Sequence, residues 1–311
     1  MLDKVRSVMI GHAVGDALGV PVEFASRNSL KHFPVTDMSG FGTYNVPAGT
    51  WSDDTSMSLC ALESLAQGTV DYDDIMKNFC KWYYDDEFTA TGVMFDVGNT
   101  CADAIVNYFD AQCTPQKCGR SDERSNGNGS LMRIHPFVLY AYCNGIKDEE
   151  VLVEMIADAS SLTHAHSCSI DGCVIYTYIL NELLNNPSKE SVYCGLNKAK
   201  RKVHSTTKYY DRLLNQDIAT YNVSSINSSG YVVDTLEAAI WCLLTTENYS
   251  DCVLKAVNLG SDTDTVAAVA GGLAGALYGI DAIPERWLKA LQNKDYIEDM
   301  CKKAYNNWEV K

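Results

Sequence analysis

Positive charge is scarce in this sequence of 311 residues: 25 Lys and Arg stand against 40 Asp and Glu, giving a formal net charge of −15. A field of that sign repels polyanions, which argues against nonspecific binding to nucleic acid or to an anionic membrane surface. A small phosphate-bearing molecule is still compatible, because metal ions and backbone N–H groups can bind it locally.

The sequence also lacks long apolar runs, Cys-x-x-Cys pairs and a secretory leader. No apolar run is long enough to span a bilayer, so we expect a soluble protein without membrane contact. Its 12 cysteines are expected to be reduced, mostly buried thiols of a cytoplasmic protein, which we further expect to be a monomer. The pairs Cys113/Cys118 and Cys168/Cys173 are spaced poorly for zinc half-sites.

Alternating strand patterns are nearly absent, and helical periodicity dominates. In residues 55–67, Leu59, Leu62 and Leu65 share one face and Gly68 is a natural stop. Hydrophobic residues make up 46% of the chain, enough for a buried core, and no change of composition marks a linker. We therefore predict a compact all-α fold in a single domain, residues 1–311. Helices are predicted over residues 55–67, 72–84, 151–161, 169–184, 233–245, 251–259 and 264–278, the last being small, apolar and central.

Three stretches interrupt the helical pattern: residues 31–51, 111–129 and 215–230. They are rich in glycine, proline or polar residues and have no periodicity. Loops of this length within a compact domain are often functional.

Two acid-rich turns, residues 52–55 and 261–265, each precede a predicted helix. A serine followed by acids is also an ordinary helix N-cap, so each turn alone has a structural explanation. If the turns converge, four carboxylates share one pocket, where charges about 4 Å apart repel by roughly 4 kcal/mol per pair at an effective dielectric of about 20. Such a set binds protons or cations, and its oxygen ligands suit two Mg²⁺, Mn²⁺ or Ca²⁺ ions rather than zinc.

Glu23 is a fifth candidate acid. It follows a stretch of small residues that favours tight helix packing, and Pro21 ends that helix. A solvated loop acid is the alternative for Glu23, and a structural role at the helix end is the alternative for Asp16.

Several segments together resemble the ADP-ribosylglycohydrolase family, which includes dinitrogenase reductase-activating glycohydrolase. They occur in the family's order and span nearly the whole chain: residues 15–24, 50–55, 95–100, 127–133, 163–166 and 260–265. The resemblance implies a compact all-helical fold and a binuclear Mg²⁺ or Mn²⁺ centre at the bottom of a cleft. It also implies cleavage of the bond between C1″ of ADP-ribose and an acceptor, such as an arginine side chain on a protein.

The resemblance further implies roles for individual residues. Glu23 matches a family glutamate beside the metals, and Asp96 matches a proton acceptor; we expect these two to be catalytic. Ser261 stands where many members carry glycine, and Ser52 where many carry threonine. The implied metal ligands are Ser52, Asp53, Asp54, Asp262, Asp264 and Thr265.

The remaining matching segments are expected to bind the ADP-ribose moiety. The turn formed by Gly127, Asn128, Gly129 and Ser130 has N–H groups that could cradle a phosphate, although a plain loop before a helix is the alternative.

Other candidates for substrate binding lie elsewhere in the chain. Gly98 and Asn99 could approach the ribose in a similar way, and by resemblance His164 hydrogen-bonds the ligand. Tyr231 is a candidate to stack on adenine, with a core role as the alternative.

The acceptor is left open, since arginine, serine, an acetyl ester as in O-acetyl-ADP-ribose, or a nucleobase would leave the same ADP-ribose half bound. Two other classes also stay open: a two-metal phosphoester or pyrophosphate hydrolase, which would release AMP, and a non-catalytic ADP-ribose-binding or structural protein. The intact acids argue against the last of these.

Overall fold

The computed structural model describes residues 1–111, 113–203 and 208–308, and helices form almost all of its regular structure. These residues contain three isolated β-bridges and no strand, which confirms the predicted all-α fold. The α-helices are α1 Leu2–Gly19, α2 Arg27–His32, α3 Asp53–Leu65, α4 Tyr72–Asp85, α5 Asn99–Phe109, α6 His135–Cys143, α7 Glu149–Ser161, α8 Ser167–Asn185, α9 Lys189–Ala199, α10 Asp211–Asn215, α11 Val232–Leu244, α12 Tyr249–Val257, α13 Thr263–Tyr278, α14 Glu285–Ala290 and α15 Lys294–Trp308.

Each of the seven predicted helical segments coincides with one of these helices, with ends displaced by a few residues at most. The displacement is mostly toward the N-terminus, because capping residues start the helices before the first apolar position. Asp148, for instance, accepts hydrogen bonds from the N–H groups of Glu150 and Val151 and so begins α7.

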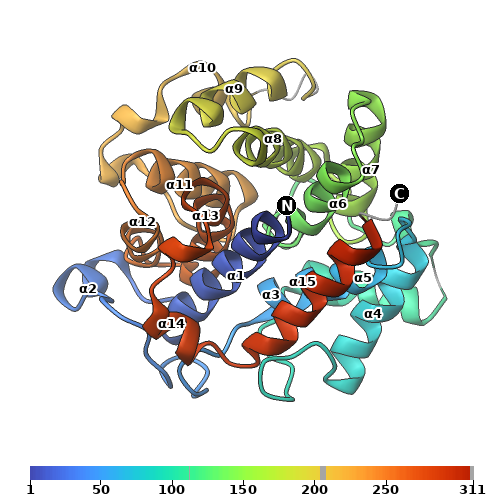
Figure 1. Cartoon of the computed structure of the whole chain (residues 1–311), viewed down its shortest axis with the longest axis horizontal. Coiled ribbons are helices and arrows are strands. Elements are labelled where there is room, and N and C mark those ends of the chain that lie inside the picture. Colours follow the sequence, from blue (N-terminus) through green and yellow to red (C-terminus); the bar gives the residue numbers. More distant parts are fainter. Residues whose placement is uncertain (112, 204–207, 309–311) are drawn as a thin grey trace.

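Helices α1 and α13 run side by side near the centre of the molecule (Figure 1). Their contact depends on glycine. A Cβ atom on Gly15 would lie 2.0 Å from the carbonyl oxygen of Ala267, and one on Gly19 would lie 2.4 Å from the Cα of Asp264. The two backbones therefore touch, and the C-terminal end of α1 lies directly against the N-terminal turn of α13. Thr263 Oγ1 fixes this end by donating to the carbonyl of Gly19 at 2.8 Å.

The other helices surround this pair. Helix α13 also contacts α8, α11 and α12, and α1 also contacts α3, α12 and α15. Nearly every residue of α13 up to Gly275 is buried, as expected for a central helix. Among their described residues, the predicted loops contain the last residues of α2 and α10 and three short 3₁₀ turns, Pro115–Lys117, Ile218–Thr220 and Val223–Ser225.

One expectation about the cysteines is wrong. Cys113 and Cys118 form a disulfide with their Cα atoms 5.4 Å apart, so this pair is neither reduced nor a zinc half-site. The short 3₁₀ turn between them brings the two side chains within bonding reach. The other ten cysteines are in no disulfide, and seven of them are buried.

Among the described helices, none combines the length and the apolar character that crossing a membrane requires.

Candidate active site

The two acid-rich turns meet in space. Thr265 Oγ1, in the first turn of α13, donates to Asp54 Oδ2 in the first turn of α3 at 3.2 Å. One carboxylate oxygen each of Asp16, Asp54 and Asp264 lies within 4.8 Å of the other two. Three helices that are distant in sequence therefore bring their acids to one point, because the glycine-mediated contact of α1 with α13 leaves no space between them.

Asp16 organises the first of these turns. Its carboxylate accepts hydrogen bonds from the backbone N–H of Ser52 at 3.0 Å and of Thr55 at 3.1 Å. It also accepts from both hydroxyls, Ser52 Oγ at 2.9 Å and Thr55 Oγ1 at 2.6 Å. Asp16 thus caps the N-terminus of α3 from a neighbouring helix and fixes the direction in which Asp53 and Asp54 leave it.

Glu23 and Asp96 form a second acidic group that shares Asp264 with the first. One oxygen of each of these three carboxylates lies within 4.8 Å of the others. The segment that carries Glu23 is tied to the second turn by a reciprocal pair of backbone bonds: Phe24 N–H donates to Ser261 O at 2.7 Å, and Ser261 N–H donates to Ala25 O at 2.8 Å.

Positive φ angles mark this junction. Phe24, Ser261 and Asp96 have φ values of 64°, 69° and 56°, in the left-handed region that glycine favours. A glycine at position 261, which many members of the resembled family carry, would adopt this backbone without strain. Conformations of this kind persist where surrounding contacts enforce them, and they often occur at functional sites.

Burial and crowding shift the titration of these acids upward. Burial raises the pKa of Asp16 to about 7, and burial together with the charge of Asp96 raises the pKa of Glu23 to about 9. Burial, reinforced by the neighbouring carboxylates, raises the pKa values of Asp53, Asp54 and Asp264 well above the usual range. The surrounding protein groups therefore do not supply enough positive charge to keep all of these carboxylates ionised.

The cluster fits divalent cations. Three of its buried carboxylate oxygens have no hydrogen-bond partner: Asp54 Oδ1, Asp262 Oδ1 and Asp264 Oδ2. Unpartnered anionic oxygens are costly to bury, and a cation would satisfy them. The ligands are all oxygen, as Mg²⁺ and Mn²⁺ prefer, and the two acidic groups that share Asp264 offer two adjacent positions.

A cavity of about 440 Å³ opens above the cluster, a volume typical of small-molecule sites. Five of the predicted catalytic and metal-binding residues reach its wall, and six of the predicted substrate-binding residues line it. The first group is Glu23, Asp53, Asp96, Asp262 and Thr265; the second is Gly98, Asn99, Gly127, Asn128, Gly129 and His164.

The glycine-rich turn is held in place from several directions. Asn128 Nδ2 donates to Asp262 Oδ2 at 2.8 Å, and its backbone N–H donates to Gly230 O at 3.0 Å. His164 packs beneath this turn, where a Cβ on Gly129 would lie 3.0 Å from the imidazole Cε1. Burial and the charge of Arg133 lower the pKa of His164 to about 3, so the ring is neutral at physiological pH.

Two predicted substrate-binding residues are placed differently. The hydroxyl of Ser130 is fully buried and accepts a hydrogen bond from Ser160 Oγ at 3.0 Å, so it lies below the cavity wall. Tyr231 is 36% exposed and precedes α11, with its hydroxyl 3.6 Å from Cys168 Sγ. Neither side chain belongs to the wall of the acidic cavity.

Sequence reasoning did not assign Asp16 to the candidate metal site. A structural role at the helix end and a functional role were both left open for it, and an acid inside a stretch of small and apolar residues was the available signal. Phe24 ends a segment that resembles the family, but it was given no role, although it is exposed and lines the cavity. Arg124, the one Lys or Arg among the described residues of the cavity wall, had no distinguishing pattern around it.

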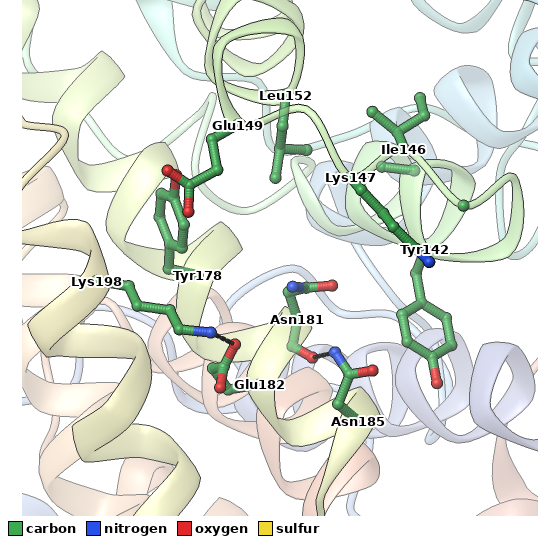
Figure 2. A pocket seen from close by; sticks show the side chains of 12 residues that line it. Tyr142, Ile146, Lys147, Glu149, Leu152, Tyr178, Asn181, Glu182, Asn185 and Lys198 are labelled. Atoms are coloured by element: carbon green, nitrogen blue, oxygen red, sulfur yellow. Dashed lines mark hydrogen bonds and ion pairs between the residues drawn. The ribbon is translucent and has the colours of Figure 1, made fainter.

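A separate cavity of about 340 Å³ lies between α6, α7, α8 and α9 (Figure 2). Three of its charged groups are paired: Lys198 Nζ lies 2.6 Å from Glu182 Oε1, and Glu149 pairs with Lys202. Among the described residues that line it, no three carboxylates converge. The acidic cavity is therefore the better candidate for chemistry.

An all-helical protein whose central helices bring acidic turns together under a small-molecule cavity belongs to a recognisable class. Comparison with known proteins identifies it: the family model described as ADP-ribosylglycohydrolase matches residues 1–311. The chain belongs to the ADP-ribosylglycohydrolase family.

Individual relatives agree over nearly the whole chain. The ADP-ribosylarginine hydrolase Tri1 of Serratia proteamaculans (strain 568) is 33% identical over 98% of this chain and 79% of its own length. The ADP-ribosyl-[dinitrogen reductase] glycohydrolase of Rhodospirillum rubrum is 31% identical over 94% of this chain and 91% of its own. A solved structure titled ADP-ribosylglycohydrolase-related protein complex superposes with a TM-score of 0.81 at 32% identity, covering 98% of both chains.

Proposed function

We propose that this protein is a metal-dependent hydrolase that cleaves the C1″ glycosidic bond of ADP-ribosylated substrates and releases ADP-ribose. The observation that carries the proposal is the meeting of both acid-rich turns with Glu23 and Asp96 beside one cavity. Arginine on a protein is the acceptor we expect first, because relatives from Serratia proteamaculans and Pseudomonas putida are named ADP-ribosylarginine hydrolases.

The cations would be two Mg²⁺ or Mn²⁺ ions held by the acid cluster, with Ser52, Asp53, Asp54, Asp262, Asp264 and Thr265 as the proposed ligands. Asp16 joins this set by its position beside Asp54 and Asp264. Bound there, the cations would orient the vicinal hydroxyls of the terminal ribose and polarise an attacking water.

The protein's own groups complete the reaction. Oxygen from water bonds to C1″ as the bond from C1″ to the guanidine nitrogen breaks, through an oxocarbenium-like transition state. We assign Glu23 as the acceptor of the proton from water and Asp96 as the base on the ribose side. The departing guanidine nitrogen takes up a proton, which leaves the acceptor as an unmodified arginine.

The rest of the cavity wall would hold the ADP-ribose half. The N–H groups of Gly127 and Gly129 suit a phosphate, and the neutral His164 can donate or accept a single hydrogen bond there. Gly98 and Asn99, at the start of α5, would contact the ribose. Tyr231 is kept as the candidate for adenine, since it follows Gly230 at the cavity edge.

A panel of ADP-ribosylated substrates, carrying arginine, serine or acetyl linkages, tests the proposal when free ADP-ribose is quantified with Mg²⁺, with Mn²⁺ and with EDTA. We expect release of ADP-ribose from the arginine linkage and its loss with EDTA. Release of AMP would identify a pyrophosphate hydrolase instead. Failure to hydrolyse any substrate in the presence of either metal would point to a non-catalytic ADP-ribose-binding protein.

The same assay tests the assignment of Glu23. Glu23→Gln should lower turnover by several decades, while calorimetry should give nearly unchanged affinity for ADP-ribose. Turnover near that of the wild type would contradict the assignment.

A further inference from the structure

Tyr44 touches Glu23 through its hydroxyl. The phenol donates to Glu23 Oε2 at 2.5 Å, at the short end of the range for O–H···O hydrogen bonds. Burial and hydrogen bonds to Glu23 and Asp96 hold the pKa of Tyr44 above its usual range, so the hydroxyl keeps its proton and stays a donor. Tyr44 lies on the loop between α2 and α3, which supplies none of the acidic residues described above.

Hydrogen bonds hold that loop against the segment that carries Glu23, and they keep Tyr44 close to Glu23. Thr43 N–H donates to Pro21 O at 3.0 Å, and Thr43 Oγ1 donates to Glu23 O at 2.9 Å. Gly42 adopts a φ of 65° and approaches so closely that a Cβ there would lie 1.9 Å from the carbonyl oxygen of Pro21. Backbone contacts therefore set the position of Tyr44 relative to Glu23.

The ring of Tyr44 makes a second contact, with Phe95. The two ring centroids are 5.0 Å apart, a normal distance for an aromatic pair. Phe95 directly precedes Asp96, whose backbone has a positive φ and needs outside support. A single side chain thus holds Glu23 by its hydroxyl and the Asp96 loop by its ring.

We propose that Tyr44 is a positioning residue that fixes the relative orientation of Glu23 and Asp96, with Oε2 of Glu23 held by the phenol and Oε1 left to accept the proton from water. This inference rests on the proposed hydrolase function and adds a residue to it. A partner in this position orients the reacting carboxylate without touching the substrate, and loss of such a partner usually costs 10- to 100-fold in rate or affinity.

Tyr44→Phe is the sharpest variant, because it removes the hydroxyl and keeps the ring against Phe95. With the substrate that the wild type hydrolyses, we expect kcat to fall roughly 10- to 100-fold. KM, the affinity for ADP-ribose and the affinity for Mn²⁺ should each change by less than about threefold, because binding groups are untouched. Tyr193→Phe is the matched control: its hydroxyl bonds Asp217 Oδ1 at 3.0 Å, far along the chain on α9, and kcat should not change.

A measurement that is independent of turnover tests the contact itself. In the double-mutant cycle of Tyr44→Phe with Glu23→Gln, the changes in unfolding free energy should be non-additive when thermal unfolding is followed in EDTA, because both substitutions affect the same hydrogen bond. An additive cycle, or an unchanged kcat in an active Tyr44→Phe enzyme, would overturn the positioning role while leaving the proposed function intact. If the wild type hydrolyses nothing, both proposals fail, and the cycle then reports only whether the contact exists.

Discussion

At the residue scale, two helices that both carry a pair of acids in their first turn show what determines this site. Helix α3 begins with Asp53 and Asp54, and α4 begins with Tyr72 followed by Asp73 and Asp74, each after a side chain that caps the N-terminus. The acids of α3 are buried, whereas Asp73 is about half exposed and pairs with Lys77 at 2.5 Å. A capping pattern predicts the start of a helix equally well in both cases, and only the tertiary structure separates a candidate metal site from an ordinary cap.

This pair gives a direct test. Asp53→Asn should weaken Mn²⁺ binding at least tenfold, about 1.4 kcal/mol. In EDTA, without metal, the variant should be as stable as the wild type or more stable, because the substitution removes one of the carboxylates that repel each other. Asp73→Asn, also in the first turn of a helix, should not change Mn²⁺ affinity, and should cost no more than about 1 kcal/mol of stability. Calorimetric titration and urea unfolding measure both quantities. Equal effects of the two substitutions would reduce Asp53 to a capping role.

Two residues whose contacts sequence reasoning did not find, Asp16 and Tyr44, share a physical cause. Asp16 acts by bonding the start of a helix 36 residues away, and Tyr44 acts by meeting Glu23 across a loop. Neither contact follows from local spacing, because each depends on how close the backbones come. The acid-rich turns were visible because each concentrates its signal in five residues or fewer, but their convergence had to be assumed.

At the element scale, helical periodicity was sufficient for the fold class and for seven helices, since an amphipathic or uniformly apolar stripe is a local property. It could not predict the pairing of α1 with α13. That pairing depends on glycines, which contribute nothing to a hydrophobic pattern. The distance between the two helices decides whether the carboxylates of Asp16 and Asp264 come together.

Gly15→Ala tests this role of the helix pair. The new methyl group would lie 2.0 Å from the carbonyl oxygen of Ala267, so the helices must separate. Overpacking costs about 1–3 kcal/mol, which exceeds the roughly 1 kcal/mol that alanine gains over glycine within a helix. We expect a lower melting temperature in EDTA and also weaker Mn²⁺ binding.

Gly98→Ala is the control for stability, because nothing lies within 4 Å of its added Cβ and its φ of −63° suits any residue. It should cost less than about 1 kcal/mol. A Gly15→Ala protein as stable as this control would show that the two helices can separate freely.

At the scale of the whole molecule, part of the excess negative charge lies in the buried carboxylates that surround Asp264. A net charge of −15 attracts cations to the surface in general, but the cluster holds several carboxylates whose pKa values are raised by burial and that have no cationic partner, unlike the buried Glu237, which pairs with Arg212. Folding therefore places these acids where they must either keep protons or bind metal, which links stability, pH and cation binding.

The sign of that linkage can be worked out. Asp16 and Glu23 have pKa values of about 7 and about 9 in the folded, metal-free protein, against ordinary values of 3.8 and 4.5. Between these limits the folded state holds protons that the unfolded state has released, so the free energy of unfolding falls as pH rises. Buried histidines act in the opposite direction, but only below a pH of about 6.5, where unfolded histidine becomes charged.

We therefore expect the melting temperature in EDTA to fall between about pH 6.5 and 8.5, and the gain from Mn²⁺ or Mg²⁺ to widen over the same range. The cations displace the retained protons, and each displaced proton should tighten the apparent Kd up to about tenfold per pH unit. Thermal scans in EDTA and in metal, paired with calorimetric titration in two buffers of different ionisation enthalpy, measure the gain and the protons released. A gain that stays constant with pH, without proton release, would place the cations outside the buried cluster and contradict the proposed centre.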